Sequence, residues 1–301
     1  MVFVFPRRYG AVTGLHIQLL APTESADFSA LTYPSYRWLL QKPGQEKAIA
    51  VGVRSGADPL GLALVHAKTT GFNQLVSFYI NPLFDTPAVR NELLSQTEAV
   101  CGAEGLETLN FLPVVWESSL QSLQWLIDRG WVYQGTRQLV CKAPVDNLLA
   151  IDWLQRPQLP AGYQCIPWAE VNDLSRQTLK NSQAHWPSLL DPFQLEKDHC
   201  KAVSQALLDE RSQIRGWLIS HAINPEVLRW TASWVDPNIQ SMTRVFPLWR
   251  NAADAQKNTG KHPQVTWTVP IGLDRMQRFT LRRIRSHLTA MGYATLLTQR
   301  L

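Results

Sequence analysis

The feature that most constrains this chain is an internal duplication. GLALVHA at 61–67 and GWLISHA at 216–222 both consist of a glycine, four mostly apolar residues, a histidine and an alanine, and they begin 155 residues apart. A proline follows each histidine by sixteen residues, as Pro82 and Pro237. A repeat kept in this register predicts two copies of one structural unit rather than a single domain of 301 residues.

Both halves show the same order of predicted elements. A strand and a helical region come first, followed by three strands, a helix, a strand, a second helix and a closing strand. We expect an N-terminal domain at 1–143, a proline-bracketed linker at 144–161 and a C-terminal domain at 162–301. Strands and helices mixed in this way predict a layered α/β or α+β fold.

Composition supports a folded chain and excludes several classes of protein. Hydrophobic residues make up 45% and charged residues 18%, which is enough to bury a large core. The four cysteines have no paired spacing and lie near no histidine cluster, so we expect free thiols, a reducing cytoplasmic location and no metal site. No apolar stretch approaches the length of a membrane span.

Outside the last 31 residues, the positive and negative charges balance. The composition therefore does not indicate a generally basic protein that binds nucleic acid.

The element order resembles that of the GNAT superfamily of N-acetyltransferases, repeated in tandem. SLQWLIDRGWVYQGTRQLVCKA, at 122–143, is similar to the family's last helix, its Gly-aromatic turn and its closing strand. YINPLF and WVDPNI resemble the strand-to-helix passage beside which the acyl-CoA lies. The resemblance implies two domains, each a mixed, mostly antiparallel twisted sheet flanked by helices. It also implies acetyl-CoA or another acyl-CoA as cofactor and acyl transfer to an amine as the reaction.

The first half departs from the family where a phosphate would bind. The loop at 82–90 has no glycine, and Asp85 would place negative charge beside a pyrophosphate. Thr86 followed by Pro87 is typical of a helix start, and the proline lacks one of the N–H groups that a phosphate would use. We therefore predict that the first half has a degenerate cofactor site.

The second half offers a different set of donors. Its loop at 236–249 also lacks glycines, but its polar and basic side chains can replace missing backbone donors. The predicted cofactor-binding residues are Asn238, Gln240, Ser241, Thr243 and Arg244.

The residue types expected for proton transfer are largely missing. The family's catalytic tyrosine position, four residues before the Gly-aromatic pair, is occupied by Leu126 and Leu288. His221 is the candidate base, because a histidine titrates near neutral pH. In a strand, His221 shares a face with Trp217 and Ile219, as His66 does with its neighbours in the first half. Recurrence in both halves fits a structural histidine as well as a catalytic one.

The last predicted helix carries a stripe of positive charge. Arginines spaced by three, four and three residues share one helical face, with Leu281, Ile284, Leu288 and Met291 expected on the core side. The stripe consists of Arg275, Arg278, Arg282 and Arg285. It is either a solvated face or a binding site for an acidic partner protein, for nucleic-acid phosphate or for a nucleotide cofactor; without interleaved aromatic residues, base stacking is disfavoured.

Two functions stay open on the sequence alone. The chain is an acyl-CoA-dependent N-acyltransferase that works mainly through its second half, or a catalytically silent scaffold of the same fold that docks an acidic partner through the arginine stripe.

Overall fold

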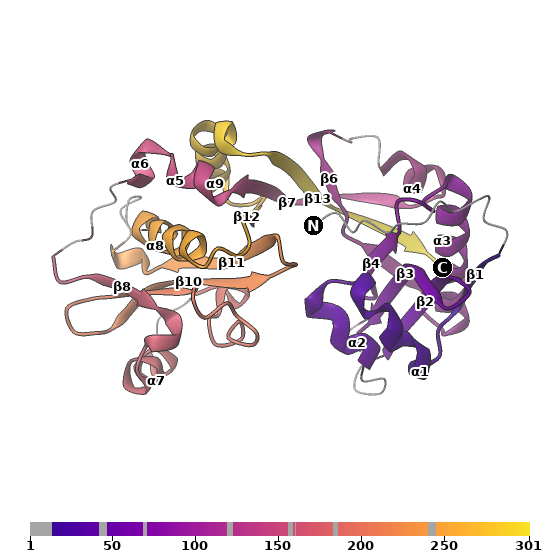
Figure 1. Cartoon of the computed structure of the whole chain (residues 1–301), viewed down its shortest axis with the longest axis horizontal. Coiled ribbons are helices and arrows are strands. Elements are labelled where there is room, and N and C mark those ends of the chain that lie inside the picture. Colours follow the sequence, from indigo (N-terminus) through magenta and orange to yellow (C-terminus); the bar gives the residue numbers. More distant parts are fainter. Residues whose placement is uncertain are drawn as a thin grey trace. The chain divides into compact units, whose positions relative to one another are not determined.

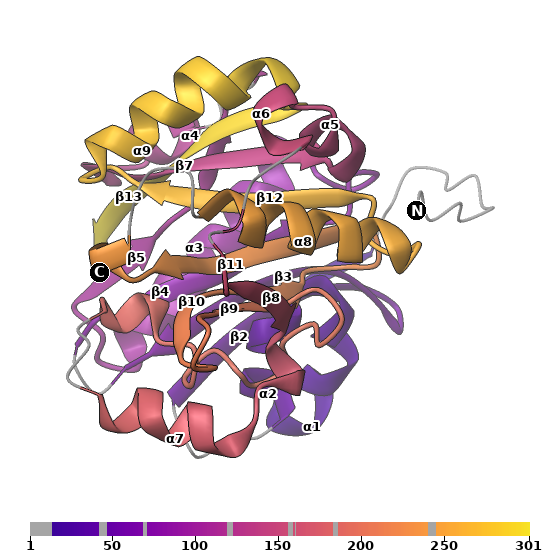
Figure 2. The same cartoon turned by 90° about the vertical axis from the view of Figure 1, so that its left-hand side faces the viewer.

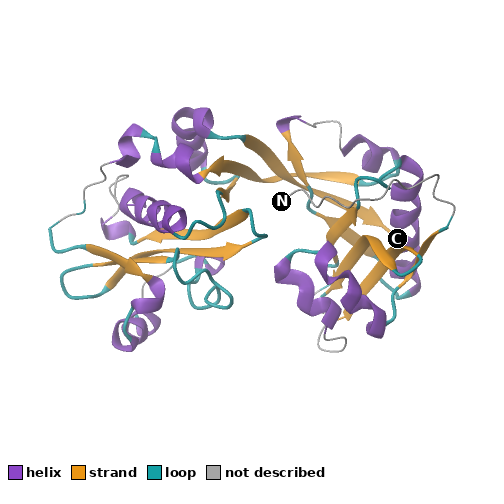
Figure 3. Cartoon of the chain, in the orientation of Figure 1, coloured by secondary structure: helices purple, strands orange, loops and turns teal. Residues whose placement is uncertain are grey.

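The structure is a computed structural model and describes residues 14–41, 47–68, 71–118, 123–155, 159, 161–182, 186–239 and 245–301 (Figure 1). The chain forms two compact units. The first unit comprises Met1–Gln138 with Gly292–Leu301, and the second comprises Leu139–Met291. Each unit is a strand-rich layer flanked by helices (Figure 3), which confirms the predicted fold class.

The first unit is built on a sheet in the order β1-β2-β3-β4-β5-β13-β7. Strands β1 to β4 are antiparallel, β4 and β5 are parallel, and β13 runs antiparallel to β5 and β6. Its elements are β1 (Leu15–Leu19), α1 (Pro22–Ser25), α2 (Arg37–Gln41), β2 (Lys47–Ser55), β3 (Asp58–Ala67), β4 (Gln74–Ile80), α3 (Pro87–Ala103), β5 (Thr108–Phe111), β6 (Val114–Trp116), α4 (Gln124–Asp128), the start of β7 (Val132–Pro144) and β13 (Ala290–Arg300).

The second unit repeats this plan, with α8 lying across one face of its strands (Figure 2). Strands β8 to β11 are antiparallel, and β11 and β12 are parallel. Its elements are α5 (Val145–Leu149), α6 (Asp152–Gln155), β8 (Gln164–Pro167), α7 (Asp173–Asn181), β9 (Gln205–Leu208), β10 (Ile214–Ala222), β11 (Val227–Val235), α8 (Val245–Asn258), β12 (Gln264–Pro270) and α9 (Asp274–Phe279).

The duplication predicted from the sequence extends to the pairing of individual residues. Hairpins β3–β4 and β10–β11 have the same register at the 155-residue offset, so that Gly61 faces Ile80 and Gly216 faces Val235. Both hairpins contain a β-bulge at the corresponding place, between Leu64 and Val65 in β3 and between Ile219 and Ser220 in β10. The two units therefore share a backbone design that includes its irregularity.

The closing strands do not follow the order expected from the sequence. Strand β13, at the end of the second half, pairs with β5 and β6 of the first unit. Its Leu297 is fully buried in the core of that unit. Strand β7 begins in the first unit and ends in the second, beside β12. The compact units thus differ from the predicted division at 143 and 162, because a strand joins whichever sheet edge accepts its hydrogen bonds, regardless of sequence order.

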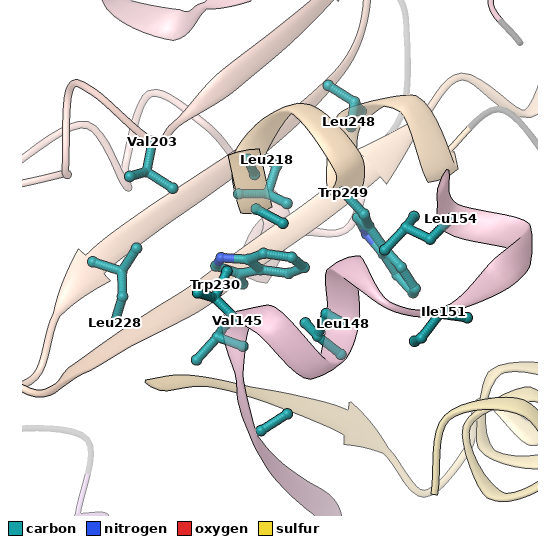
Figure 4. Packing of buried hydrophobic residues seen from close by; sticks show 14 of the residues in the cluster. Val145, Leu148, Ile151, Leu154, Val203, Leu218, Leu228, Trp230, Leu248 and Trp249 are labelled. Atoms are coloured by element: carbon teal, nitrogen blue, oxygen red, sulfur yellow. The ribbon is translucent and has the colours of Figure 1, made fainter. Parts of the chain in front are cut away.

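The segment expected to be a linker, 144–161, is largely part of the second unit's core. Val145, Leu148, Ile151 and Leu154 are at most 5% exposed. Figure 4 shows Leu148, Ile151 and Leu154 near Trp249 of α8, and Val145 near Trp230 of β11. The spacing of three residues places all four on one side of the consecutive short helices α5 and α6, which is why the segment packs instead of spanning solvent.

The last predicted helix, 274–293, is shorter than expected. α9 continues as a π turn at Thr280–Ile284 and a 3₁₀ turn at Arg285–His287, after which β13 begins at Ala290. Gly292 therefore lies within a strand, not in a turn. A Cβ atom at this glycine would lie 2.7 Å from the carbonyl oxygen of Val115, so the residue permits close approach of β13 to β6.

In each unit, hydrophobic clusters lie on both faces of the sheet. The first unit buries one cluster around α3 and another around α2 and the 3₁₀ turn at Ala26–Leu31, and the second does so around α8 and around α7. Strands covered on both faces account for the nearly continuous apolar runs in the sequence. In the described part of the chain, no helix is long and apolar enough to cross a membrane.

Candidate functional site

The central feature of each unit is a pair of parallel strands that separate. Strand β4 pairs with β5 only as far as Leu75, opposite Phe111, and β11 pairs with β12 only as far as Arg229, opposite Thr266. The bulge on the neighbouring hairpin lies one residue beyond the last parallel pair in the first unit and two residues beyond it in the second, leaving Val76 and Thr231 without a cross-strand partner. Beyond this point, backbone groups of β4 and β11 no longer pair with the parallel neighbouring strand. Each of these two strands then leads into the loop before a helix N-terminus.

In the first unit, the loop before α3 uses its own backbone donors. Leu83 N–H donates to Asn81 Oδ1 at 3.1 Å, and Phe84 N–H donates to the Asn81 carbonyl at 2.8 Å. Thr86 caps the helix as predicted, since its hydroxyl accepts from Val89 N–H at 3.3 Å. These N–H groups are therefore not directed at a ligand.

A carboxylate of the protein lies where an anion would bind in the first unit. Asp85, two residues before the first residue of α3, makes a two-point ion pair with Arg90, with N–O distances of 3.0 and 2.8 Å. The Arg90 guanidinium also lies 5.7 Å from the centre of the Trp125 ring. A negative side chain is favourable at a helix N-terminus, and here it has its own cation. A pyrophosphate would have to displace this pair.

Aromatic rings bridge the diverging strands of the same unit. The ring of Phe78 on β4 lies 6.4 Å from that of Phe111 on β5 and 5.8 Å from that of Trp125 on α4. Trp131 contacts Phe111 from the turn after α4, where Gly130 adopts a φ of 91°. Aromatic rings thus connect β4, β5 and the segment 124–131 in the first unit, and the degenerate cofactor site stays a prediction.

The corresponding loop of the second unit begins with the same turn but carries different charge. Asp236 Oδ1 accepts from Asn238 N–H at 2.9 Å, and its Oδ2 accepts from Arg215 Nη1 at 2.9 Å. Arg215 also pairs with Asp209. Between Asp236 and the first residue of α8 the sequence holds no acid and one arginine, Arg244. Here the strand-end carboxylate is engaged by Arg215 and by the Asn238 N–H group.

Only part of the predicted cofactor set lies in the described structure. Asn238 is exposed on a 3₁₀ turn at Pro237–Ile239. Gln240, Ser241, Thr243 and Arg244 lie outside the described residues. Amide, hydroxyl and guanidinium donors are the chemistry that a phosphate requires. The donor set of this loop therefore fits a pyrophosphate, although Pro247 in the first turn of α8 lacks an N–H group.

A small side chain replaces the bridging aromatic residue in the second unit. Ser233 occupies the position that corresponds to Phe78, and its hydroxyl accepts from Trp249 Nε1 at 2.9 Å. Trp249 also lies near Phe246, whose ring stacks on Phe279 at 5.6 Å. The sequence did not single out Ser233, because a lone serine in an apolar strand becomes conspicuous only once the hairpins are aligned.

His221 lies on the predicted face of β10, together with Trp217 and Ile219. Its Nε2 is 3.0 Å from the carbonyl oxygen of Leu195 and 3.1 Å from that of Lys197, so Nε2 carries the proton and donates. Nδ1 then accepts from the hydroxyl of Thr231, the bulge residue, at 2.7 Å.

Burial lowers the pKa of His221, and the two backbone carbonyls oppose this shift only in part. The imidazole is therefore neutral at neutral pH, and its single lone pair is directed at Thr231. Sequence reasoning did not identify Thr231, because nothing in one sequence indicates a bulge. His66 is buried in the first unit, where its ring meets that of Trp38 edge to face at 5.7 Å.

Neither leucine at the family's tyrosine position can supply a proton. Leu126 is 1% exposed in the first unit's core, and Leu288 packs against the core of the second. In the described part of the chain, no group of three or more His, Cys, Asp or Glu residues could hold a metal ion. Burial raises the pKa of Cys101, Cys141 and Cys165 to about 12, which keeps these thiols protonated and unreactive.

All four arginines of the predicted stripe are exposed, and Arg283 joins them. Ile284 and Met291 are buried and Leu288 is half-buried, as expected. The prediction for Leu281 was wrong, because this residue is 39% exposed. The π turn has a longer repeat than an α-helix, so residues after Thr280 no longer follow the α-helical phase on which the prediction rested.

Comparison with solved structures identifies the architecture. A tandem GNAT protein from the clavulanic acid biosynthesis pathway superimposes with a TM-score of 0.67 at 13% identity, over 95% of this chain and 98% of that one. The chain has the tandem GNAT fold. GCN5-related N-acetyltransferases from Sphaerobacter thermophilus and Kribbella flavida match with TM-scores of 0.51 and 0.52 at 14% identity, over 95% and 91% of this chain and 95% of each of theirs.

No protein-family profile and no curated protein sequence matches the chain. The resemblance read from the sequence is thereby confirmed for the fold and its duplication.

Proposed function

We propose that the second unit transfers an acyl group from an acyl-CoA, such as acetyl-CoA, to an amine. The observation that carries this proposal is the contrast between the two loops that follow the diverging strands. In the first unit, Asp85 and Arg90 occupy the approach to the helix. In the second, Asp236 is bound by Arg215, and the sequence from 237 to 244 contains polar residues and one arginine, Arg244, but no acid.

The predicted loop residues have one role in this proposal, which is to hold the phosphates. Arg244 would supply positive charge, and neutral donors from the loop would satisfy the remaining oxygens. Those donors are the side chains of Asn238, Gln240, Ser241 and Thr243. The cofactor supplies a thioester whose thiolate leaves readily, so the reaction tolerates leucines at the family's acid position.

His221 serves as proton acceptor through Thr231. The Thr231 hydroxyl already donates to Nδ1 at 2.7 Å, so it can take a proton from an incoming ammonium while it passes its own to the ring. The two carbonyls at Nε2 fix the ring in the tautomer that leaves Nδ1 basic. A lowered pKa keeps that nitrogen unprotonated at neutral pH.

Calorimetric titration of the full chain with acetyl-CoA tests the proposal. We expect one binding site per chain and at least tenfold weaker binding by Arg244→Gln. The matched control is Arg90→Gln in the corresponding loop of the first unit, which should bind as the wild type does. The proposal fails if the wild type does not bind at millimolar acetyl-CoA, or if Arg90→Gln is the variant that loses binding.

The second candidate function is that of a silent scaffold, which binds an acidic partner protein through Arg275, Arg278, Arg282 and Arg285. The exposure of all four guanidinium groups favours it. Affinity capture from a lysate with the wild type and with Arg278→Glu/Arg282→Glu tests this function. Recovery of the same proteins by both rules it out.

A further inference from the structure

Three tryptophan rings meet on the α7 side of the second unit's sheet, at Trp186, Trp217 and Trp234. Trp217 on β10 and Trp234 on β11 are directly opposite each other, and their rings stack with centres 4.4 Å apart. Trp186 lies beside this stack, with its ring centre 5.3 Å from that of Trp217 and 6.1 Å from that of Trp234. Trp217 is fully buried, whereas Trp186 and Trp234 are half-buried. Part of the Trp234 ring is therefore accessible.

Within the described part of the chain, one face of the Trp234 ring meets no other aromatic ring. Trp217 covers the face that is turned toward β10, because the two residues form a cross-strand pair. The outer face is turned toward β12, which is the neighbour of β11 on its other side. At this level β12 no longer pairs with β11, since their last pair joins Arg229 to Thr266. Trp234 thus borders the diverging strands of the proposed acyl-transfer site.

Trp234 also shares a face of the sheet with the proposed proton acceptor. Ser233 contacts Trp249 of α8 on one face, so the next residue, Trp234, projects from the other. His221 projects from that second face as well, and there it bonds the Thr231 hydroxyl at 2.7 Å. A rise of about 3.3 Å per residue places Trp234 about 10 Å along β11 from Thr231. One ligand can therefore reach the hydroxyl and the ring at the same time.

Aromatic faces on this side of the unit already hold cations. Arg176 lies 4.8 Å from the centre of the Trp168 ring, and Lys180 lies 4.6 Å from that of Phe193; both cations come from α7. Among the described residues, no cationic side chain lies over Trp234. The indole face is the aromatic surface that attracts a cation most strongly. A cation that occupies the outer face of Trp234 would come from a ligand.

We propose that Trp234 binds a second positive charge of the acyl acceptor. One nitrogen of the acceptor lies at the Thr231 hydroxyl, and an ammonium group at its other end lies over the outer face of Trp234. The acceptor is thus an amine with a second cationic group about 10 Å or less from the first. Trp186 packs against the side of the stack and limits the movement of Trp234. The inference rests on the proposed acyl transfer for its role, but this binding requires no cofactor.

Calorimetric titration of the full chain in the absence of acyl-CoA tests the proposal. The probes are 1,6-diaminohexane and hexylamine, which has the same carbon chain but a single ammonium group. We expect the wild type to bind the diamine at least about fivefold more tightly, the gain from one cation on an indole face. Trp234→Leu should bind both amines equally. Trp234→Phe should show a smaller preference than the wild type, because a phenyl ring attracts a cation less strongly than an indole does.

The matched control is Tyr79→Leu. Tyr79 is the residue of the first unit that corresponds to Trp234, and it is 41% exposed. This variant should keep the full preference for the diamine. The proposal is overturned if the wild type binds both amines equally or neither, if either Trp234 variant keeps the full preference, or if Tyr79→Leu loses it. Failure of the wild type to bind acetyl-CoA would defeat the proposed acyl transfer but leave these results unchanged, so the two failures are distinguishable.

Discussion

Replacing Leu297 by alanine gives the sharpest structural prediction, because this residue is near the end of the chain yet lies in the core of the first unit. Leu297 is fully buried on β13, opposite Phe111 of β5. A buried leucine replaced by alanine costs about 2–5 kcal/mol, with the upper part of the range where the site cannot collapse. Strand β13 is hydrogen-bonded between β5 and β7, so its backbone cannot move to fill the cavity. We therefore expect a loss of about 3 kcal/mol or more.

Hydrogen exchange followed by mass spectrometry locates this loss. Peptides from β3 to β5, in the first unit, should lose protection, whereas peptides from β9 to β11 should keep theirs. The matched control is Leu218→Ala, which also removes a fully buried leucine but lies in the core of the second unit, and it should show the reverse pattern. If Leu297→Ala loosens β9 to β11 and leaves β3 to β5 unchanged, the assignment of β13 to the first unit is wrong.

Three further predictions address the second unit and the thiols. Leu148→Ala should destabilise the second unit by about 2–5 kcal/mol in urea unfolding, since the residue belongs to that core; a cost near zero would restore the linker interpretation. The folded-state pKa of His221 lies below its ordinary value of 6.5, so the unfolded chain binds a proton first and stability should fall as the pH drops below 6.5. His221→Gln should weaken that pH dependence, and an unchanged slope contradicts the burial argument. Cys101 and Cys141 should react with iodoacetamide at pH 7 only after unfolding, because burial raises the pKa of both thiols to about 12; rapid labelling of the native chain contradicts this.

Most of the fold could be predicted from the repeat in the sequence. The spacing of the two glycine-to-histidine stretches predicted two copies of one structural unit, and the structure reproduces this spacing down to the bulges. The sequence could not show which unit each closing strand joins, because 137–143 and 294–299 are both short apolar runs that suit the sheet of either unit. Only long-range pairing decides which sheet accepts them.

The candidate site was predicted in part. Asp85 was predicted to place negative charge beside a phosphate, and Thr86 to cap the helix; the cap is confirmed, and the structure adds that Asp85 is paired with Arg90. Thr231 and Ser233 were missed, because hydroxyl groups gain meaning only from the bulge and from the tryptophan that they meet. The linker was misassigned because flanking prolines indicate a loop, whereas the apolar spacing between them indicates packed turns.

Hydrogen exchange of the full chain with and without acetyl-CoA tests the central claim most directly. The account predicts added protection in peptides from the end of β11 through the first turns of α8, at 230–250, and none in the corresponding peptides from β4 to α3, at 75–95. Protection confined to 75–95, or equal protection in both segments, would contradict the proposal that the second unit alone holds the acyl donor.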